Sequence, residues 1–194
     1  TAQSSPTVIW PFNHKHATDT GAEHYIRDAA IADARAVIEF KHRIWREIYA
    51  DLKDTAFFDT AEATIGEQVK FWQSRIRRGE TIWLAEDLRG TIVGTIHATE
   101  TLSDQTAQFA ELYGLANLHD IRFFYVSNDA RDTIVGETLI QHAVGERSAL
   151  AWLSGTTPLV ESSLRAAGFE PLGEPVEPTT EPWQGVPRHA MVRK

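Results

Sequence analysis

The sequence predicts a fold of the α/β (α+β) class, with strands and helices in one domain. The chain has 194 residues, of which 42% are hydrophobic and 24% charged, a composition typical of a globular domain that buries its own core. The apolar pattern changes from helical to strand periodicity near Thr81. From Ile121 onward a strand, a turn and a helix follow one another, and a further strand and helix come after them. Size, the change of period and this alternation together predict the class.

The first part of the chain predicts one short strand and two helices. Residues 25–27 form the predicted strand. Apolar residues at helical spacing over 31–52 predict the first helix, and their stripe has one break, at Lys41. A second helix is predicted over 61–78, because its apolar stripe ends in basic residues just before Gly79.

A β-hairpin is predicted next. The runs 81–86 and 91–100 are typical of strands, and residues 87–90 between them, Asp-Leu-Arg-Gly, have the chemistry of a hairpin turn. The connector 103–117 is predicted to be partly helical. The run 121–126, Ile-Arg-Phe-Phe-Tyr-Val, is the strongest predicted strand, since β-branched and aromatic residues dominate it.

The rest of the domain alternates helix and strand. A helix is predicted over 135–144, a strand over 149–153, and a helix over 158–168 that opens on Thr-Pro and closes on Gly. Strands over 169–172 and 190–193 complete the predicted order β-α-α-β-β-β-α-β-α-β-β.

The domain organisation follows from where polar and proline-rich segments lie. Residues 1–23 are polar and irregular and are predicted to be a flexible N-terminal arm, while residues 24–194 form one domain. Five of the eight prolines lie between Pro171 and Pro187. Because proline fixes φ and lacks an N–H donor, residues 173–188 are predicted to be a long loop without regular structure.

Composition excludes several classes of function. The net charge of −8 argues against a nucleic-acid binder, whose affinity depends on Lys and Arg. The absence of Cys excludes disulfides, thiolate metal ligands and a Cys nucleophile. No run of 18 apolar residues could span a membrane, and no secretory signal is visible, so we expect no membrane partner and a cytoplasmic location.

The strand, turn and helix over 121–146 carry the chemistry that the sequence predicts. A helix N-terminus presents unpaired backbone N–H groups and the positive end of the helix dipole, and both favour phosphate binding. The run 130–136, Ala-Arg-Asp-Thr-Ile-Val-Gly, lies where this helix begins. We therefore expect a phosphate-binding loop there.

This run resembles the pyrophosphate loop of the GNAT superfamily of acetyl-CoA-dependent N-acetyltransferases. The family's loop reads Arg/Gln-x-x-Gly-x-Gly/Ala and follows a strand that ends in an aromatic residue and Val. Arg131 and Gly136 stand at its first and last positions, and Tyr125 and Val126 end the strand.

Two other segments agree with the family in order along the chain. Residues 25–34 are similar to its opening strand and helix, and residues 165–170, with Gly168 and Phe169, are similar to the close of its last helix. The resemblance extends over 25–194. It implies a mixed, mostly antiparallel central sheet of about six to seven strands flanked by helices.

The resemblance also implies a reaction and its residues. An acetyl group would pass from acetyl-CoA, as co-substrate, to a primary amine of a small molecule or peptide by direct attack. The implied cofactor-binding residues are Tyr125, Val126, Arg131, Asp132, Thr133, Ile134, Val135 and Gly136. A His or carboxylate on the central strands commonly deprotonates the amine in this family, which makes His119 and Asp120 the candidate catalytic residues, with His97 as a further candidate. No metal is expected.

Three positions depart from the family's pattern and keep a second hypothesis open. Ile134 stands in place of the middle glycine, Thr157 in place of an Asn, and Leu164 in place of the Tyr that often protonates the departing thiolate. An aliphatic side chain cannot donate a proton. The alternative hypothesis is a catalytically degenerate GNAT-fold binding or interaction module.

The acceptor is predicted from the proline-rich loop and the net charge. In the family that the chain resembles, this connection borders the acceptor side of the cleft. The resemblance therefore implies that Trp183 covers that side and that Glu174, Glu177 and Glu181 favour a cationic acceptor. The identity of the amine, the length of the acyl group and the choice between monomer and homodimer stay open.

Overall fold

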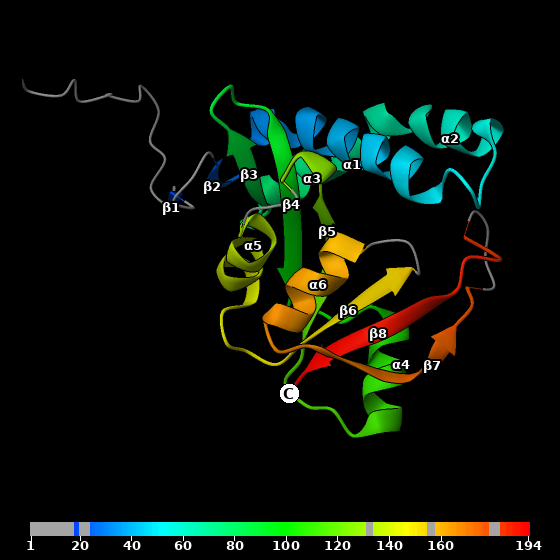
Figure 1. Ribbon diagram of the computed structural model, residues 1–194. Helices are drawn as coiled ribbons and strands as arrows, with labels where there is room; N and C mark the ends of the chain where they lie inside the picture. The colour runs from blue at the N-terminus through cyan, green and yellow to red at the C-terminus, as the bar shows by residue number, and fades with distance from the viewer. Residues whose placement is uncertain (1–17, 20–23, 131–133, 155–157, 179–182) are drawn as a thin grey trace, which may run out of the picture.

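One mixed sheet organises the chain in a computed structural model that describes residues 18–19, 24–130, 134–154, 158–178 and 183–194 (Figure 1). The strands are β1 (Thr18–Asp19), β2 (His24–Asp28), β3 (Trp83–Asp87), β4 (Ile92–Thr99), β5 (His119–Val126), β6 (Ala149–Ser154), β7 (Glu170–Val176) and β8 (Arg188–Arg193). The helices are α1 (Ala34–Tyr49), α2 (Thr55–Glu62), α3 (Ile65–Arg77), α4 (Asp104–Tyr113), α5 (Val135–Val144) and α6 (Pro158–Ala166).

The strands follow the order β1-β2-β3-β4-β5-β6-β8-β7 across the sheet. Neighbouring strands are antiparallel except β5 and β6, which are parallel. This arrangement confirms the mixed, mostly antiparallel sheet flanked by helices. No helix in the described part of the chain combines the length and apolar character that crossing a bilayer requires.

Helices cover both faces of the sheet. On one face α1 and α3 pack against Leu84, Ile92 and Phe123. On the other face α5 and α6 pack against Ala85, Ile121 and other apolar side chains of the central strands. The helices therefore enclose two cores, one on each side of the central strands.

Helix α4 extends the α1 face over the far half of the sheet. Its Phe109 packs with Leu150 of β6 and Ala190 of β8. Leu150 alternates along β6 with Ala149 and Ala151, which face α5 and α6, so α4 covers the same face as α1. The predicted partly helical connector is confirmed as this helix, which begins after Ser103, whose hydroxyl caps it by accepting from the Thr106 N–H.

The predicted hairpin is confirmed, while the boundaries of the helices differ from prediction. The N–H groups of Arg89 and Thr91 both donate to the Asp87 carboxylate and so fix the β3–β4 turn. The first helix ends at Tyr49, before the predicted boundary. Helix α2 was not predicted, and it begins where the Asp54 carboxylate accepts the Phe57 N–H at 2.9 Å.

The proline-rich segment is partly ordered as a strand, which corrects the prediction for its first residues. Strand β7 extends to Val176 and contains Pro171 and Pro175. Proline lacks an N–H donor, but β7 is an edge strand, so its outer side needs none. On the inner side the register with β8 shifts between Leu172 and Val176. Thr18 and Asp19, assigned by the sequence to the arm, pair with β2. The other residues of 1–23 lie outside the described residues.

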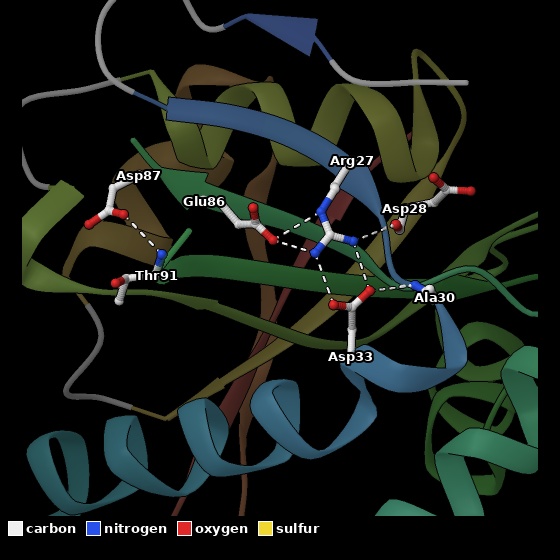
Figure 2. A network of polar contacts seen from close by, with 7 residues as sticks. All are labelled: Arg27, Asp28, Ala30, Asp33, Glu86, Asp87 and Thr91. Carbon is white, nitrogen blue, oxygen red and sulfur yellow. Dashed lines mark hydrogen bonds and ion pairs between the residues drawn. The ribbon is translucent and has the colours of Figure 1, made fainter. Parts of the chain in front are cut away.

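Arg27 ties the start of the α1 segment to the sheet (Figure 2). Its guanidinium donates to both carboxylate oxygens of Asp33, at 2.7 and 2.9 Å, and to the Glu86 carboxylate on β3. The Asp33 carboxylate also accepts the Ala30 N–H at 2.6 Å. These groups are largely buried, so the bonds are shielded from water. The network fixes the turn from β2 into α1.

We expect Arg27→Met to lower the free energy of unfolding by about 1–3 kcal/mol, because it leaves two half-buried carboxylates without their shared donor. The matched control is Arg35→Met, which removes an exposed i,i+4 pair with Glu39 and should cost less than about 0.5 kcal/mol. Urea unfolding of both variants and the wild type measures the difference. Equal losses for the two variants would contradict the role of the network.

Gly136 lets α5 and α6 approach closely. A Cβ at this position would lie 2.1 Å from Ser163 Oγ and 2.8 Å from Ser163 Cβ. Ser163 itself donates to the Leu159 carbonyl at 2.9 Å, so its side chain belongs to the helix contact. The glycine is therefore needed for packing between the helices.

Gly136→Ala should destabilise the protein by about 1–3 kcal/mol through overpacking. Gly66 is the matched control, because both glycines are the second residue of their helix and a Cβ at Gly66 meets nothing within 4 Å. Gly66→Ala should be neutral or stabilise by up to about 1 kcal/mol. Thermal unfolding of the two variants checks this, and a Gly136→Ala variant as stable as wild type would show that the helices can move apart.

Candidate active site

The parallel strands β5 and β6 pair over three residues and then part. His119–Ile121 are in register with Ala149–Ala151, and beyond this point neither strand pairs with the other. Figure 1 shows β6 diverging from β5 toward its C-terminal end. The edge of β5 over residues 122–126 that faces β6 has no strand partner among the described residues. The parted strands leave an opening in the middle of the sheet.

A cavity of about 430 Å³ occupies this opening. It is lined by residues of α1, β5, β6 and α6 and of the chain just before and at the start of β8. The polar side chains that matter below are Lys41, Tyr49, Asp120, Tyr125, Ser154 and Arg188. A volume of this size holds a small ligand.

A β-bulge on β5 sets which side chains enter the cavity from each face. His97 of β4 is in register with Phe123 and Ala98 with Ile121, so Arg122 is the extra residue. The bulge shifts the alternation along β5. As a result Phe124 joins Ile121 on the face of α5 and α6, while Phe123 packs in the core on the face of α1.

Helix α1 connects both of the parted strands. The Trp45 indole N–H donates to the Tyr125 hydroxyl on β5 at 2.8 Å. One turn later the Tyr49 hydroxyl hydrogen-bonds Ser154 Oγ on β6 at 2.7 Å. Because residues four apart lie on the same side of a helix, a single helical face bonds to the two sides of the opening.

Trp183 lines the cavity next to aromatic side chains of α1 and α2. Its ring lies 4.9 Å from Trp45, 5.2 Å from Tyr49 and 5.4 Å from Phe57, measured between ring centroids. Lys53 anchors the neighbouring backbone by donating to the Gln184 carbonyl at 3.1 Å. The sequence predicted that Trp183 covers a cleft, and in the structure its side chain lines this cavity. Trp183 also belongs to an aromatic cluster that the sequence did not indicate.

Two cationic side chains line the cavity without an anionic partner. Lys41 Nζ lies over the rings of Trp45, at 4.8 Å, and Phe123, at 5.6 Å. Burial lowers the pKa of Lys41 to about 8. Burial also lowers the pKa of Arg188, which begins β8. Neither makes an ion pair with any described residue.

The two candidate catalytic residues lie in different places. Asp120 lines the cavity, but its carboxylate already accepts the Ser103 N–H at 2.8 Å and an Arg122 N–H at 3.3 Å. His119 lines a second cavity with Glu100, whose carboxylate lies 3.5 Å from His119 Nε2. Successive residues of a strand point to opposite faces, so the structure does not bring His119 and Asp120 together.

His97 lies with His119 in the second cavity. It is buried, its Nδ1 lies 2.8 Å from the Thr81 carbonyl oxygen, and its ring packs against Trp72. Burial lowers the pKa of His97, and the Glu80 carboxylate lies 3.3 Å from its Nε2. The described residues hold no group of three or more His, Asp or Glu side chains placed to bind a metal ion.

The predicted cofactor loop is described in part. Arg131, Asp132 and Thr133 lie outside the described residues. Ile134 is 53% exposed and immediately precedes α5, whose first residues, Val135 and Gly136, are buried. The exposed side chains of the described helix start are therefore Ile134 and, in the first turn, Glu137.

The last two side chains of β5, Tyr125 and Val126, lie on opposite faces of the sheet. Tyr125 lines the cavity, and Val126 packs against the core beneath α5. Leu164, at the position where the family resemblance gives Tyr, is fully buried in that core and does not line the cavity.

The sequence analysis did not identify Lys41, Tyr49 or Arg188 as site residues. The signal for Lys41 was present as the break in the apolar stripe of α1. Tyr49 fitted that stripe as a core residue. Arg188 gave no signal, because its place in the cavity depends on the pairing of β8 with β6.

Comparisons with known proteins support the fold. No family model matches the chain, and no curated protein matches it. Among solved structures, a GNAT superfamily phosphinothricin acetyltransferase from Sinorhizobium meliloti, in complex with AcCoA, is 24% identical with a TM-score of 0.59, covering 89% of this chain and 88% of its own.

Two further structures agree with this result. An acetyltransferase of the GNAT family from Streptococcus pneumoniae is 16% identical with a TM-score of 0.58, over 88% of this chain and 98% of its own. A ribosomal-protein-alanine N-acetyltransferase from Brucella melitensis is 18% identical with a TM-score of 0.58, over 87% of this chain and 98% of its own. The protein described here has the fold of the GNAT superfamily of acetyltransferases.

Proposed function

We propose that the protein is an N-acetyltransferase that moves an acetyl group from acetyl-CoA to a primary amine. The observation that carries this proposal is the parting of β5 and β6 around a lined cavity, in a fold shared with acetyltransferases. The opening offers an unpaired strand edge on one side and polar side chains from α1 on the other. A thioester and an amine can meet between them.

The open edge of β5 suits the pantetheine arm of acetyl-CoA. That arm contains two amides, and an extended strand edge binds amides through its backbone N–H and C=O groups. The edge over residues 122–126 leads toward the start of α5, where backbone N–H groups favour phosphate. The pyrophosphate of the cofactor would lie at this helix start, with Ile134 beside it.

The reaction proceeds by direct attack. The amine nitrogen bonds to the thioester carbonyl carbon, the C–S bond breaks, and the nitrogen loses a proton while the thiolate gains one. A backbone N–H of the β5 edge stabilises the oxyanion that forms on the carbonyl oxygen. The chain has no Cys to carry an acyl-enzyme intermediate.

Tyr125 is the proposed proton donor to the departing thiolate. Its oxygen accepts the Trp45 N–H, so the hydroxyl hydrogen stays available, and no described residue accepts it. Burial raises the pKa of Tyr125 well above its ordinary value, which keeps the phenol protonated at neutral pH. Tyr125 would thus supply the proton that Leu164 cannot donate.

Isothermal titration with acetyl-CoA tests the proposed function against the binding-module alternative. For the wild type we expect a dissociation constant for acetyl-CoA in the micromolar range. Ile134→Gly should leave this constant unchanged or lower it. The substitution removes an exposed side chain at the helix start without loss of core packing. Leu88→Gly, at an exposed turn residue, is the control for removing an apolar side chain. No binding at millimolar acetyl-CoA would favour the module.

Tyr125→Phe should lower kcat by about 100-fold, since a proton donor is lost, while the KM for acetyl-CoA stays within about twofold. Tyr113→Phe, on the exposed surface of α4, is the control and should keep wild-type kinetics. Steady-state rates at saturating amine measure the effect. An unchanged kcat in Tyr125→Phe would rule out the assigned role.

A further inference from the structure

The charges that line the cavity are unbalanced. Lys41 and Arg188 both line it, one from α1 and one from the start of β8. Asp120 is the only carboxylate among the described residues that line the cavity, and Arg122 and the Ser103 N–H already bond to it. Among the residues that the structure describes, no anionic side chain pairs with either Lys41 or Arg188.

Burying such charges costs stability unless something compensates for the lost water. Both side chains are half-buried, and for both the pKa is lowered mainly by burial. The chain as a whole has a net charge of −8, so the excess of positive charge in this cavity is opposite in sign to the charge of the whole protein. The aromatic rings beneath Lys41 compensate only in part.

The neighbouring groups are also hydrogen-bond donors. Lys41, Trp45 and Tyr49 repeat at four-residue spacing along α1, so they line one side of the helix that faces the opening. Arg188 is in register with Ser154 of β6, which brings its charge within electrostatic reach of Tyr49 and Tyr125. The two cations therefore line the same cavity as the bonded Trp45 and Tyr49 side chains.

We propose that the amine acceptor also carries an anionic group, as a free amino acid does, and that Lys41 and Arg188 bind that group. This inference rests on the proposed acetyltransferase function and specifies its substrate class. A carboxylate between the two cations would gain charge-assisted hydrogen bonds in a site shielded from water. The amine of the same small molecule would then be held next to the open edge of β5.

This proposal replaces the cationic acceptor that the sequence favoured. Glu174 and Glu177 are exposed and do not line the cavity. Glu181 lies outside the described residues. The described side chains of residues 173–188 that do line the cavity are Trp183, Val186 and Arg188, and none of them is acidic.

The test compares acceptors that differ only in the anionic group. Acetylation rates are measured at saturating acetyl-CoA for a panel of L-amino acids, the corresponding amino amides and a diamine. We expect kcat/KM to be at least about tenfold higher for the acids than for the amides or the diamine. Lys41→Met and Arg188→Met should each remove about tenfold of this preference through KM for the acids.

The controls remove equally charged but exposed side chains. Lys70→Met on α3 and Arg89→Met in the β3–β4 turn should keep the wild-type preference. Titration with acetyl-CoA shows whether Lys41 or Arg188 binds the phosphates of the cofactor instead. A tenfold weaker binding of acetyl-CoA in either variant, with the preference for acids intact, would overturn the assignment.

A second measurement needs no variant. An α-hydroxy acid should compete with the matching amino acid in the wild type, while the hydroxy amide should not. Equal inhibition by the two, a preference for the diamine, or no acetylation of any amino acid by a protein that binds acetyl-CoA would overturn the proposal. Failure to bind acetyl-CoA at all would overturn the proposed function instead.

Discussion

The three-residue pairing of β5 with β6 is the constraint on which the site depends. Two parallel strands that stayed paired along their length would fill the middle of the sheet with backbone hydrogen bonds. By parting after Ile121 and Ala151, they leave backbone groups and side chains facing a shared space. The cost of the unpaired edge is offset by α1, whose Trp45 and Tyr49 bond to both sides of the opening. The helix therefore acts as a bridge across a break in the sheet.

Most of the fold could be predicted because its signals are local. The strand over 121–126 and the hairpin around 87–90 depend on residue types within a few positions, and both are present. Helix α2 was harder to predict, because Phe58 is its only buried residue and the start of α3 after Thr64 has no side-chain capping hydrogen bond. The last part of β7 was hidden by its prolines, which are tolerated because the strand lies at the edge.

The site was harder to predict than the fold, because it is assembled from distant segments. Tyr125 was found from its place at the end of a strand, whereas Arg188 enters the cavity through strand pairing that no short motif encodes. His119 and Asp120 show the opposite situation. They are adjacent in the sequence, but along β5 they point to opposite faces and line two different cavities. The Asp120 carboxylate also accepts a hydrogen bond from the N–H of Ser103, just before α4.

Because of where Trp183 lies, residues that determine acceptor specificity can change without loss of stability of the fold. This ring forms one wall of the cavity, yet it comes from the chain between an edge strand and β8 and packs in a small aromatic cluster with Tyr49 and Phe57. The larger core beneath α5 and α6 makes no use of it. Substitutions in this segment can reshape the pocket while the central sheet stays intact. A lineage could thus change its acceptor through one peripheral connection and keep the same scaffold.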